Sequence, residues 1–384
     1  MHASPLHADF IVRGRLAGRD LVCWLARGIL LALPLLVFAI AADAGTTESA
    51  GADLPLVAII TTGGTIAEKA SHSTGAVPAV KGRQLVQSVP GLSNVARIEL
   101  TNFMNVDSSQ MTPADWLNLH RVVEGILERD EIAGAVVTHG TDTMAEAAFL
   151  MDVLLKSHKP VVFTGAMRPA SSPEPDGPLN ILNAVHQVVL STDKNWGVTV
   201  TLNNYINAAR NARKSQTTNV QTFTSGEKGY LGYLVDGQLV QFNEPMQRVQ
   251  VSLPVSAGYV VPEIPLLRDY SGSDGRFIRY ALETGAKGIV VEGVGAGNVN
   301  EKTNDAILEA LRRRVPVVIA TSVHNGSVEP IYGDQGGGAE LREAGVISAG
   351  DLSAAKARLL LMAALMAFGN DQPRLKAVFG ELNR

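Results

Sequence analysis

The sequence predicts a protein of the α/β class, with a larger N-terminal parallel-sheet domain and a second, smaller C-terminal α/β domain. From Pro55 onward, short β-branched runs alternate with segments of helical periodicity, a pattern typical of βαβ units. The periodicity weakens between about Glu244 and Pro265, where prolines recur, and the alternation then resumes on a smaller scale. The chain has 384 residues, of which 46% are hydrophobic, so it can form two cores of ordinary domain size.

Six short apolar runs are expected to be buried strands, and four segments are expected to be helices. The strands cover 56–61, 133–138, 160–164, 197–202, 287–291 and 316–320, and the helices cover 114–129, 144–155, 177–190 and 353–367. Thr112 and Pro113 are the expected N-cap and first residue of the first helix. Thr143 and Glu146 have the spacing of a capping box at the second.

The N-terminal segment reads as a secretory signal peptide. Four arginines precede the uncharged run 28–42, and Ala42-Asp43-Ala44 has the small-x-small form of a cleavage site. An uncleaved anchor is the alternative, but the run is only about 15 residues, short of the ~20 that span a bilayer. We therefore expect 1–44 to be the signal peptide, 54–244 the N-terminal catalytic domain, 245–262 a linker and 263–384 the C-terminal domain.

Composition narrows the function classes. The net charge is only -4 and the basic residues are dispersed, so nothing indicates a nucleic-acid partner. The single cysteine, Cys23, lies in the expected signal peptide. Cleavage would leave an exported, periplasmic or secreted protein without a disulfide, a thiol nucleophile or a membrane segment.

Two threonine motifs follow expected strands: Thr62-Gly63-Gly64-Thr65-Ile66-Ala67 and Thr138-His139-Gly140-Thr141-Asp142-Thr143. Ligands of open parallel α/β sheets bind at the carboxyl ends of strands, which is where both motifs are placed. A plain turn or a phosphate cradle is the alternative for the first motif, but neither glycine-rich nucleotide-binding pattern is present.

A threonine hydroxyl needs a neighbouring base or cation to act as a nucleophile. Thr141 and Asp142 form one strand-end pair, and Lys214 lies in a polar segment that follows the strand 197–202. Taken singly, each of these residues is more often structural than catalytic. No second histidine stands at metal-ligand spacing from His139, which we interpret as a residue that organises the backbone.

Together the two motifs resemble the signature motifs of the bacterial L-asparaginases, a family that includes periplasmic type II enzymes and glutaminase-asparaginases. The resemblance continues through 165–169, 176–180, the Lys214 segment and 293–298, and so covers nearly the whole chain from about Leu56. It implies a flavodoxin-like N-terminal domain, an amidohydrolase that converts L-asparagine to L-aspartate and ammonia, and no metal or organic cofactor. It also implies a homotetramer built from intimate dimers.

The resemblance implies roles for individual residues. Thr65 would be the nucleophile, and Thr141, Asp142 and Lys214 the second catalytic group. The residues implied in substrate binding are Gly64, Ser108, Ser109, Asp142, Ala166, Asn298 and Glu329, of which Asn298 and Glu329 would come from a neighbouring subunit.

This chain departs from the type II pattern in its lid. Type II enzymes carry an activating tyrosine after the first motif, whereas the segment 68–79 offers Ser71, His72 and Ser73, and the first tyrosine is Tyr205. Tyr332 of a neighbouring subunit is one hypothesis for the missing hydroxyl, and a packed or surface aromatic is the other.

Ser109, where many type II enzymes have glutamine, resembles the cytoplasmic type I branch and leaves the choice between asparagine and glutamine open. Two alternatives follow: a glutaminase or other small-amide hydrolase on the same scaffold, and an exported amino-acid-binding protein with weakened catalysis. The complete set of Thr65, Thr141, Asp142 and Lys214 argues against a binder, which has no need of a nucleophile.

Overall fold

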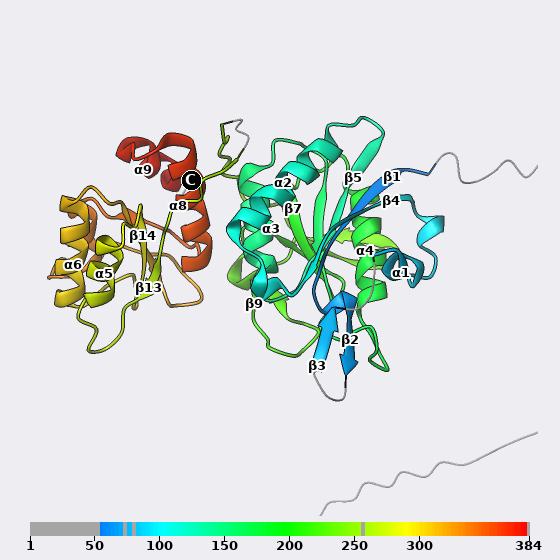
Figure 1. Cartoon of the computed structure of the whole chain (residues 1–384), viewed down its shortest axis with the longest axis horizontal. Helices are drawn as coiled ribbons and strands as arrows, with labels where there is room; N and C mark the ends of the chain where they lie inside the picture. Colours follow the sequence, from blue (N-terminus) through cyan, green and yellow to red (C-terminus); the bar gives the residue numbers. More distant parts are fainter. Residues whose placement is uncertain (1–53, 72–74, 79–81, 255–257, 382–384) are drawn as a thin grey trace, which may run out of the picture. The chain divides into compact units, whose positions relative to one another are not determined.

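The computed structural model describes residues 54–71, 75–78, 82–254 and 258–381 (Figure 1). The expected signal peptide, 1–44, lies outside the described residues. None of the helices within the described ranges has both the length and the hydrophobicity that crossing a bilayer requires.

The N-terminal sheet has eight strands in the order β12-β11-β8-β7-β6-β5-β1-β4. Five are parallel: β4 (Arg97–Val106), β1 (Leu56–Gly63), β5 (Ile132–Thr138), β6 (Val161–Thr164) and β7 (Val198–Leu202). Three antiparallel strands extend the sheet beyond β7: β8 (Tyr205–Ala208), β11 (Gly232–Val235) and β12 (Gln238–Gln241). The order of the parallel strands is the flavodoxin-like order, with the first strand inside the sheet.

Helices cover both faces of the parallel strands, because alternate side chains of a buried strand point to opposite faces. Ile60 and Val137 pack in the core cluster that contains α2 (Pro113–Leu127) and α3 (Met144–Leu154). Ile59 and Val136 belong instead to the cluster of α1 (Gly82–Gln87) and α4 (Gly177–Leu190). The two clusters hold the strand ends in fixed positions.

The C-terminal sheet is parallel, in the order β13 (Leu266–Arg268), β14 (Ile289–Gly293), β15 (Val317–Thr321), β16 (Ile347–Ser348). On one face it packs against α5 (Arg276–Glu283), α6 (Glu301–Arg312) and α7 (Gly338–Ala344). On the other it packs against α8 (Ala354–Phe368) and α9 (Gln372–Gly380), and Figure 1 shows α6 and α8 on opposite sides of this sheet. Helix α8 also packs against α3, so one hydrophobic cluster continues from the first sheet into the second.

Short turns and small hairpins lie in the connections between the main strands and helices. The first threonine motif leads into a 3-10 turn, η1 (Thr65–Ala67), and then into the hairpin β2 (Glu68–Ser71) and β3 (Gly75–Pro78). A second 3-10 turn, η3 (Ser108–Gln110), follows β4. Further along the chain, β9 (Arg213–Lys214) pairs with β10 (Phe223–Thr224), and the turns η2 (Leu92–Asn94) and η4 (Gly226–Lys228) lie in loops.

The predicted fold class is confirmed, and all six predicted strands and four predicted helices are present, with no end shifted by more than two residues. The predicted N-cap of α2 is also confirmed, since Thr112 Oγ1 accepts a hydrogen bond from Asp115 N. The capping box predicted at Thr143 is wrong. Its hydroxyl makes no cap bond and donates instead to the carbonyl oxygen of Ser108, at 2.9 Å, because the loop after β4 lies beside the start of α3.

The strand β4 escaped prediction because its residues are exposed or only partly buried, which removes the continuous apolar signal. In the predicted linker, residues 245–254 and 258–262 have no regular secondary structure. They are nevertheless attached to α3: Arg248 pairs with the buried Asp152 at 2.7 Å. Burial raises the pKa of Asp152, and the Arg248 guanidinium opposes that rise.

Candidate active site

The two threonine motifs lie side by side at the carboxyl ends of adjacent strands. Strands β1 and β5 are in parallel register, with Thr61 opposite Thr138. The Thr62 hydroxyl donates to the Thr138 carbonyl oxygen at 3.1 Å, and both threonines are buried. Residues Thr62 and Thr138 therefore join the motifs below the site, and the residues that follow them form its surface.

Glycines let the loops at these strand ends touch through their backbones. Gly64 has a φ of +80°, and a Cβ there would lie 2.3 Å from Gly140 Cα. A Cβ on Gly140 would lie 2.6 Å from Ser108 Oγ. No side chain fits at either position without moving its neighbours. The contact joins the loops that continue into Thr65 and Thr141, and it places Ser108 against Gly140.

Lys214 joins the second motif by two hydrogen bonds. Its Nζ lies 2.9 Å from Thr141 Oγ1 and 2.6 Å from Asp142 Oδ1. The Lys214 side chain is 20% exposed and that of Asp142 is 62% exposed, so the pair opens to solvent on the carboxylate side. The residues that the sequence suggested as a second catalytic group are thus brought together, although Lys214 is 72 residues from Asp142.

Ala166 lies at the end of β6, the next strand of the sheet, and is buried. Its loop is held by Asp176, whose carboxylate accepts hydrogen bonds from the backbone N–H groups of Met167 and Arg168 at 2.9 to 3.2 Å. Sequence reasoning gave Asp176 no role. The sequence signal for Asp176 was its position before Gly-Pro, which is typical of a residue at the start of a helix. In the structure its side chain makes no N-cap hydrogen bond at the start of α4 and binds the Ala166 loop instead.

His139 supports the backbone of the second motif. It is fully buried, and its Nδ1 lies 2.7 Å from the Gly140 carbonyl oxygen. Because a carbonyl oxygen only accepts, Nδ1 carries the proton. Burial lowers the pKa of His139 to about 4, so the ring is neutral at pH 7 and is suited to orienting the backbone.

The remaining predicted site residues have other hydrogen-bond partners. Ser109 is exposed, and its backbone N–H donates to Asp107. Asn298 follows β14 in the C-terminal domain, where its Oδ1 accepts from Gly338 N at 3.3 Å. Glu329 is an exposed residue of the same domain, with its N–H bonded to Ala296 O.

The lid and the proposed substitute tyrosine are described only in part. Ser71 belongs to β2, whereas His72 and Ser73 lie outside the described residues. Tyr332 lies in a loop of the C-terminal domain and is 51% exposed. Its side chain is available at the surface, where a second copy of the chain could meet it.

The arrangement has the parts of a hydroxyl nucleophile site. Thr65 follows Gly64, whose backbone contacts Gly140. Thr141, which follows Gly140, contacts a lysine that is itself paired with a carboxylate. A linked hydroxyl, amine and carboxylate can transfer a proton to or from a substrate held above the strand ends. Among the described residues, no group of three or more histidine, cysteine, aspartate or glutamate side chains is placed to hold a metal ion.

Comparison with known protein families identifies two matching regions. Residues 56–248 match the family model described as Asparaginase, N-terminal, and residues 263–379 match the Glutaminase/Asparaginase C-terminal domain.

Individual relatives agree with these matches. The chain is 34% identical to the probable periplasmic L-asparaginase of Haemophilus influenzae over 84% of this chain and 91% of the relative. It is 33% identical to L-asparaginase 2 of Escherichia coli, over 85% and 93% of the two chains. A crystal structure of a probable cytoplasmic L-asparaginase from Campylobacter jejuni superposes with a TM-score of 0.76 at 36% identity, covering 85% of this chain and 99% of that one. Two matching domain models and relatives of this coverage show that the chain belongs to the asparaginase family.

Proposed function

We propose that this protein hydrolyses the side-chain amide of L-asparagine to give L-aspartate and ammonia. The observation that carries the proposal is the hydrogen-bonded group of Thr141, Asp142 and Lys214, on a motif whose Gly140 touches Gly64, the residue before Thr65. Relatives that match most of the chain bear the name L-asparaginase, which supports the same reaction.

In the proposed reaction, Thr65 Oγ bonds to the amide carbon and the carbon–nitrogen bond breaks. The hydroxyl proton passes to the departing nitrogen, which leaves as ammonia, and the acyl group remains as an ester on Thr65. Water then attacks the ester, L-aspartate leaves and Thr65 regains its proton. The Thr141 and Lys214 pair moves protons in both halves, and backbone N–H groups stabilise the oxyanion.

The substrate is proposed to lie over the glycine contact. Ser108 and Ser109 would bind its α-carboxylate, and Asp142 would pair with its α-ammonium group. Gly64 would contribute its backbone, and the main chain at Ala166 would contact the amide that is hydrolysed. Asp142 suits this role because its side chain is largely exposed while one oxygen is held by Lys214.

Asn298 and Glu329 are proposed to complete the site of a neighbouring subunit in a homotetramer built from intimate dimers. Both lie in loops at the C-terminal sheet, close to exposed apolar side chains such as Val294 and Ile331. In the proposed assembly, the neighbouring subunit covers these apolar side chains. Tyr332 is proposed to enter the neighbouring site by the same route.

We propose that the protein is exported and that cleavage follows Ala44. The arginine-rich start, the apolar run and the small-x-small sequence support export, as does the name of the Haemophilus relative.

Ammonia release tests the reaction and the nucleophile together. We expect the parent protein to release ammonia from L-asparagine faster than from L-glutamine or N-blocked asparagine. Thr65→Ala and Lys214→Met should each lower kcat at least about 1,000-fold, because members of a catalytic group act as a unit. Circular dichroism should remain that of the parent, and near-normal turnover by the Thr65→Ala protein would remove Thr65 from the role of nucleophile.

Subunit mixing tests the shared site. Thr65→Ala and Asn298→Ala proteins, each inactive alone, should regain about a quarter of parental activity after co-refolding at equal amounts, because random pairing gives half mixed dimers with one intact site each. Thr65→Ala mixed with Lys214→Met is the control and should stay inactive, since both changes lie in the same half of the site. No recovery in the first mixture would show that Asn298 serves its own chain.

Export is checked by intact mass. The protein recovered from the periplasm or medium of an expressing bacterium should lack residues 1–44 and begin at Gly45. A full-length mass in the membrane fraction would instead support the uncleaved anchor.

A further inference from the structure

A buried lysine of the C-terminal domain binds the segment that leads to Lys214. Lys356 lies in the first turn of α8 and is 2% exposed. Its Nζ donates to three backbone carbonyl oxygens, those of Ala209 and Arg210 at 2.9 Å each and that of Ala212 at 2.5 Å. All three carbonyls belong to the turn between β8 and β9, and β9 contains Lys214.

A buried lysine at this position would destabilise the fold without compensating hydrogen bonds. Burial lowers the pKa of Lys356, because an ammonium group loses its hydration there. The first turn of a helix also disfavours positive charge, because the helix dipole has its positive end there. The three carbonyl bonds replace the lost water and satisfy every donor of the ammonium group.

Helix α3, which begins just after Asp142, also interacts with Lys356. Glu146 lies in the first turn of α3, four residues after Asp142. Burial raises the pKa of Glu146, and the positive charge of Lys356 opposes this rise. Lys356 also lies over the ring of Phe149 on α3, at 5.7 Å from its centroid. Lys356 therefore interacts with α3, which begins after Asp142, and with the turn that leads to Lys214.

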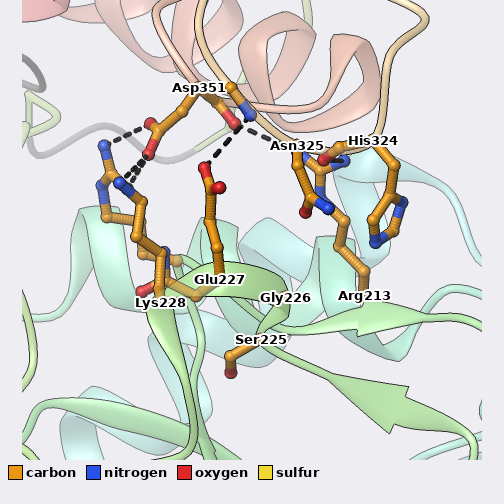
Figure 2. A pocket seen from close by; sticks show the side chains of 11 residues that line it. Arg213, Ser225, Gly226, Glu227, Lys228, His324, Asn325 and Asp351 are labelled. Carbon is orange, nitrogen blue, oxygen red and sulfur yellow. Dashed lines mark hydrogen bonds and ion pairs between the residues drawn. The ribbon is translucent and has the colours of Figure 1, made fainter.

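Neighbouring bonds attach the same segment to the C-terminal domain. Arg210 pairs with Asp351 at 2.7 Å, and Arg213 donates to the carbonyl oxygens of Asp351 and His324 (Figure 2). Arg210 is buried like Lys356, but Arg210 and Arg213 reach the C-terminal domain through their own long side chains. Lys356 instead bonds three backbone carbonyl oxygens of the turn itself. The Lys356 contact is therefore the one that acts directly on the path of the backbone.

We propose that Lys356 is a positioning residue for Lys214: its ammonium group organises the 209–212 turn so that β9 presents Lys214 to Thr141 and Asp142. The inference rests on the proposed role of Lys214. It makes helix α8 a part of the active-site framework, although α8 supplies no group that touches substrate.

Lys356→Met tests the proposal, because methionine fills a similar volume without donors or charge. We expect kcat for L-asparagine to fall at least tenfold with KM changed less than about threefold, since a displacement of about 1 Å in a catalytic group can cost about 100-fold. In a Lys214→Met background the same change should alter the residual rate less than about twofold, because its effect passes through Lys214. An equal loss in both backgrounds, or parental kcat in the folded single variant, would overturn the proposal.

A control and a second variant separate positioning from stability. Leu361→Ala is a buried change on the same helix, where Leu361 packs against Gly288 of the C-terminal domain. It should lower the melting temperature yet leave kcat within about twofold of the parent well below that temperature. If Lys356→Met does not fold, Lys356→Met with Glu146→Gln removes both buried charges and is measured instead. Failure of both to fold would show a purely structural role and count against positioning.

The same experiments distinguish this inference from the proposed function. High activity in the Lys214→Met protein would contradict the proposed catalytic group itself. An inactive Lys214→Met protein combined with a fully active, folded Lys356→Met protein would contradict only the positioning role.

Discussion

The contact between Gly64, Gly140 and Ser108 is the constraint on which the rest of the site depends. A Cβ on Gly64 or Gly140 would lie within 2.6 Å of an atom of the adjacent loop. Because interiors are close-packed, such an overlap would separate the loops. The contact lets three loops from β1, β5 and β4 meet above the sheet, and it joins the motifs of Thr65 and Thr141, which are 76 residues apart in sequence. The parallel register of β1 and β5 places the ends of the two strands side by side. The glycines then allow the loops that follow these strands to come into contact.

The second constraint comes from outside that sheet. Among the described residues, Lys214 is on a two-residue strand in a two-stranded sheet with β10, which gives it few backbone hydrogen bonds. The C-terminal domain bonds the segment before this strand through Lys356 and Arg210, and the strand itself through Arg213. The two domains thus contribute differently: the first carries the candidate catalytic residues, and the second contacts the segment on which Lys214 lies.

Much of this could be predicted from the sequence. Buried parallel strands are continuous apolar runs, so the strands 56–61 and 133–138 and their polar ends were recognisable, and so was the α/β class. The pairing of Lys214 with Thr141 and Asp142 was suggested by residue type and by resemblance, and the hydrogen bonds in the structure agree with it.

Other features depend on contacts between distant segments, which local patterns do not encode. The sequence predicts Thr143 to be a helix-capping residue, but its hydroxyl donates a hydrogen bond to the carbonyl oxygen of Ser108 instead. Lys356 reads as an ordinary helix lysine, and only the fold places three carbonyl oxygens around its ammonium group.

The kcat/KM of Gly140→Ala for L-asparagine tests the central claim most directly, with Gly125→Ala as the control. Gly125 lies on α2, where an added Cβ meets nothing within 4 Å. The glycine contact predicts that Gly140→Ala loses at least about 100-fold while remaining folded, because its methyl group displaces Ser108 and the first motif. Gly125→Ala should be as active as the parent and slightly more stable. Parental kcat/KM in Gly140→Ala would contradict the claim that this contact assembles the site.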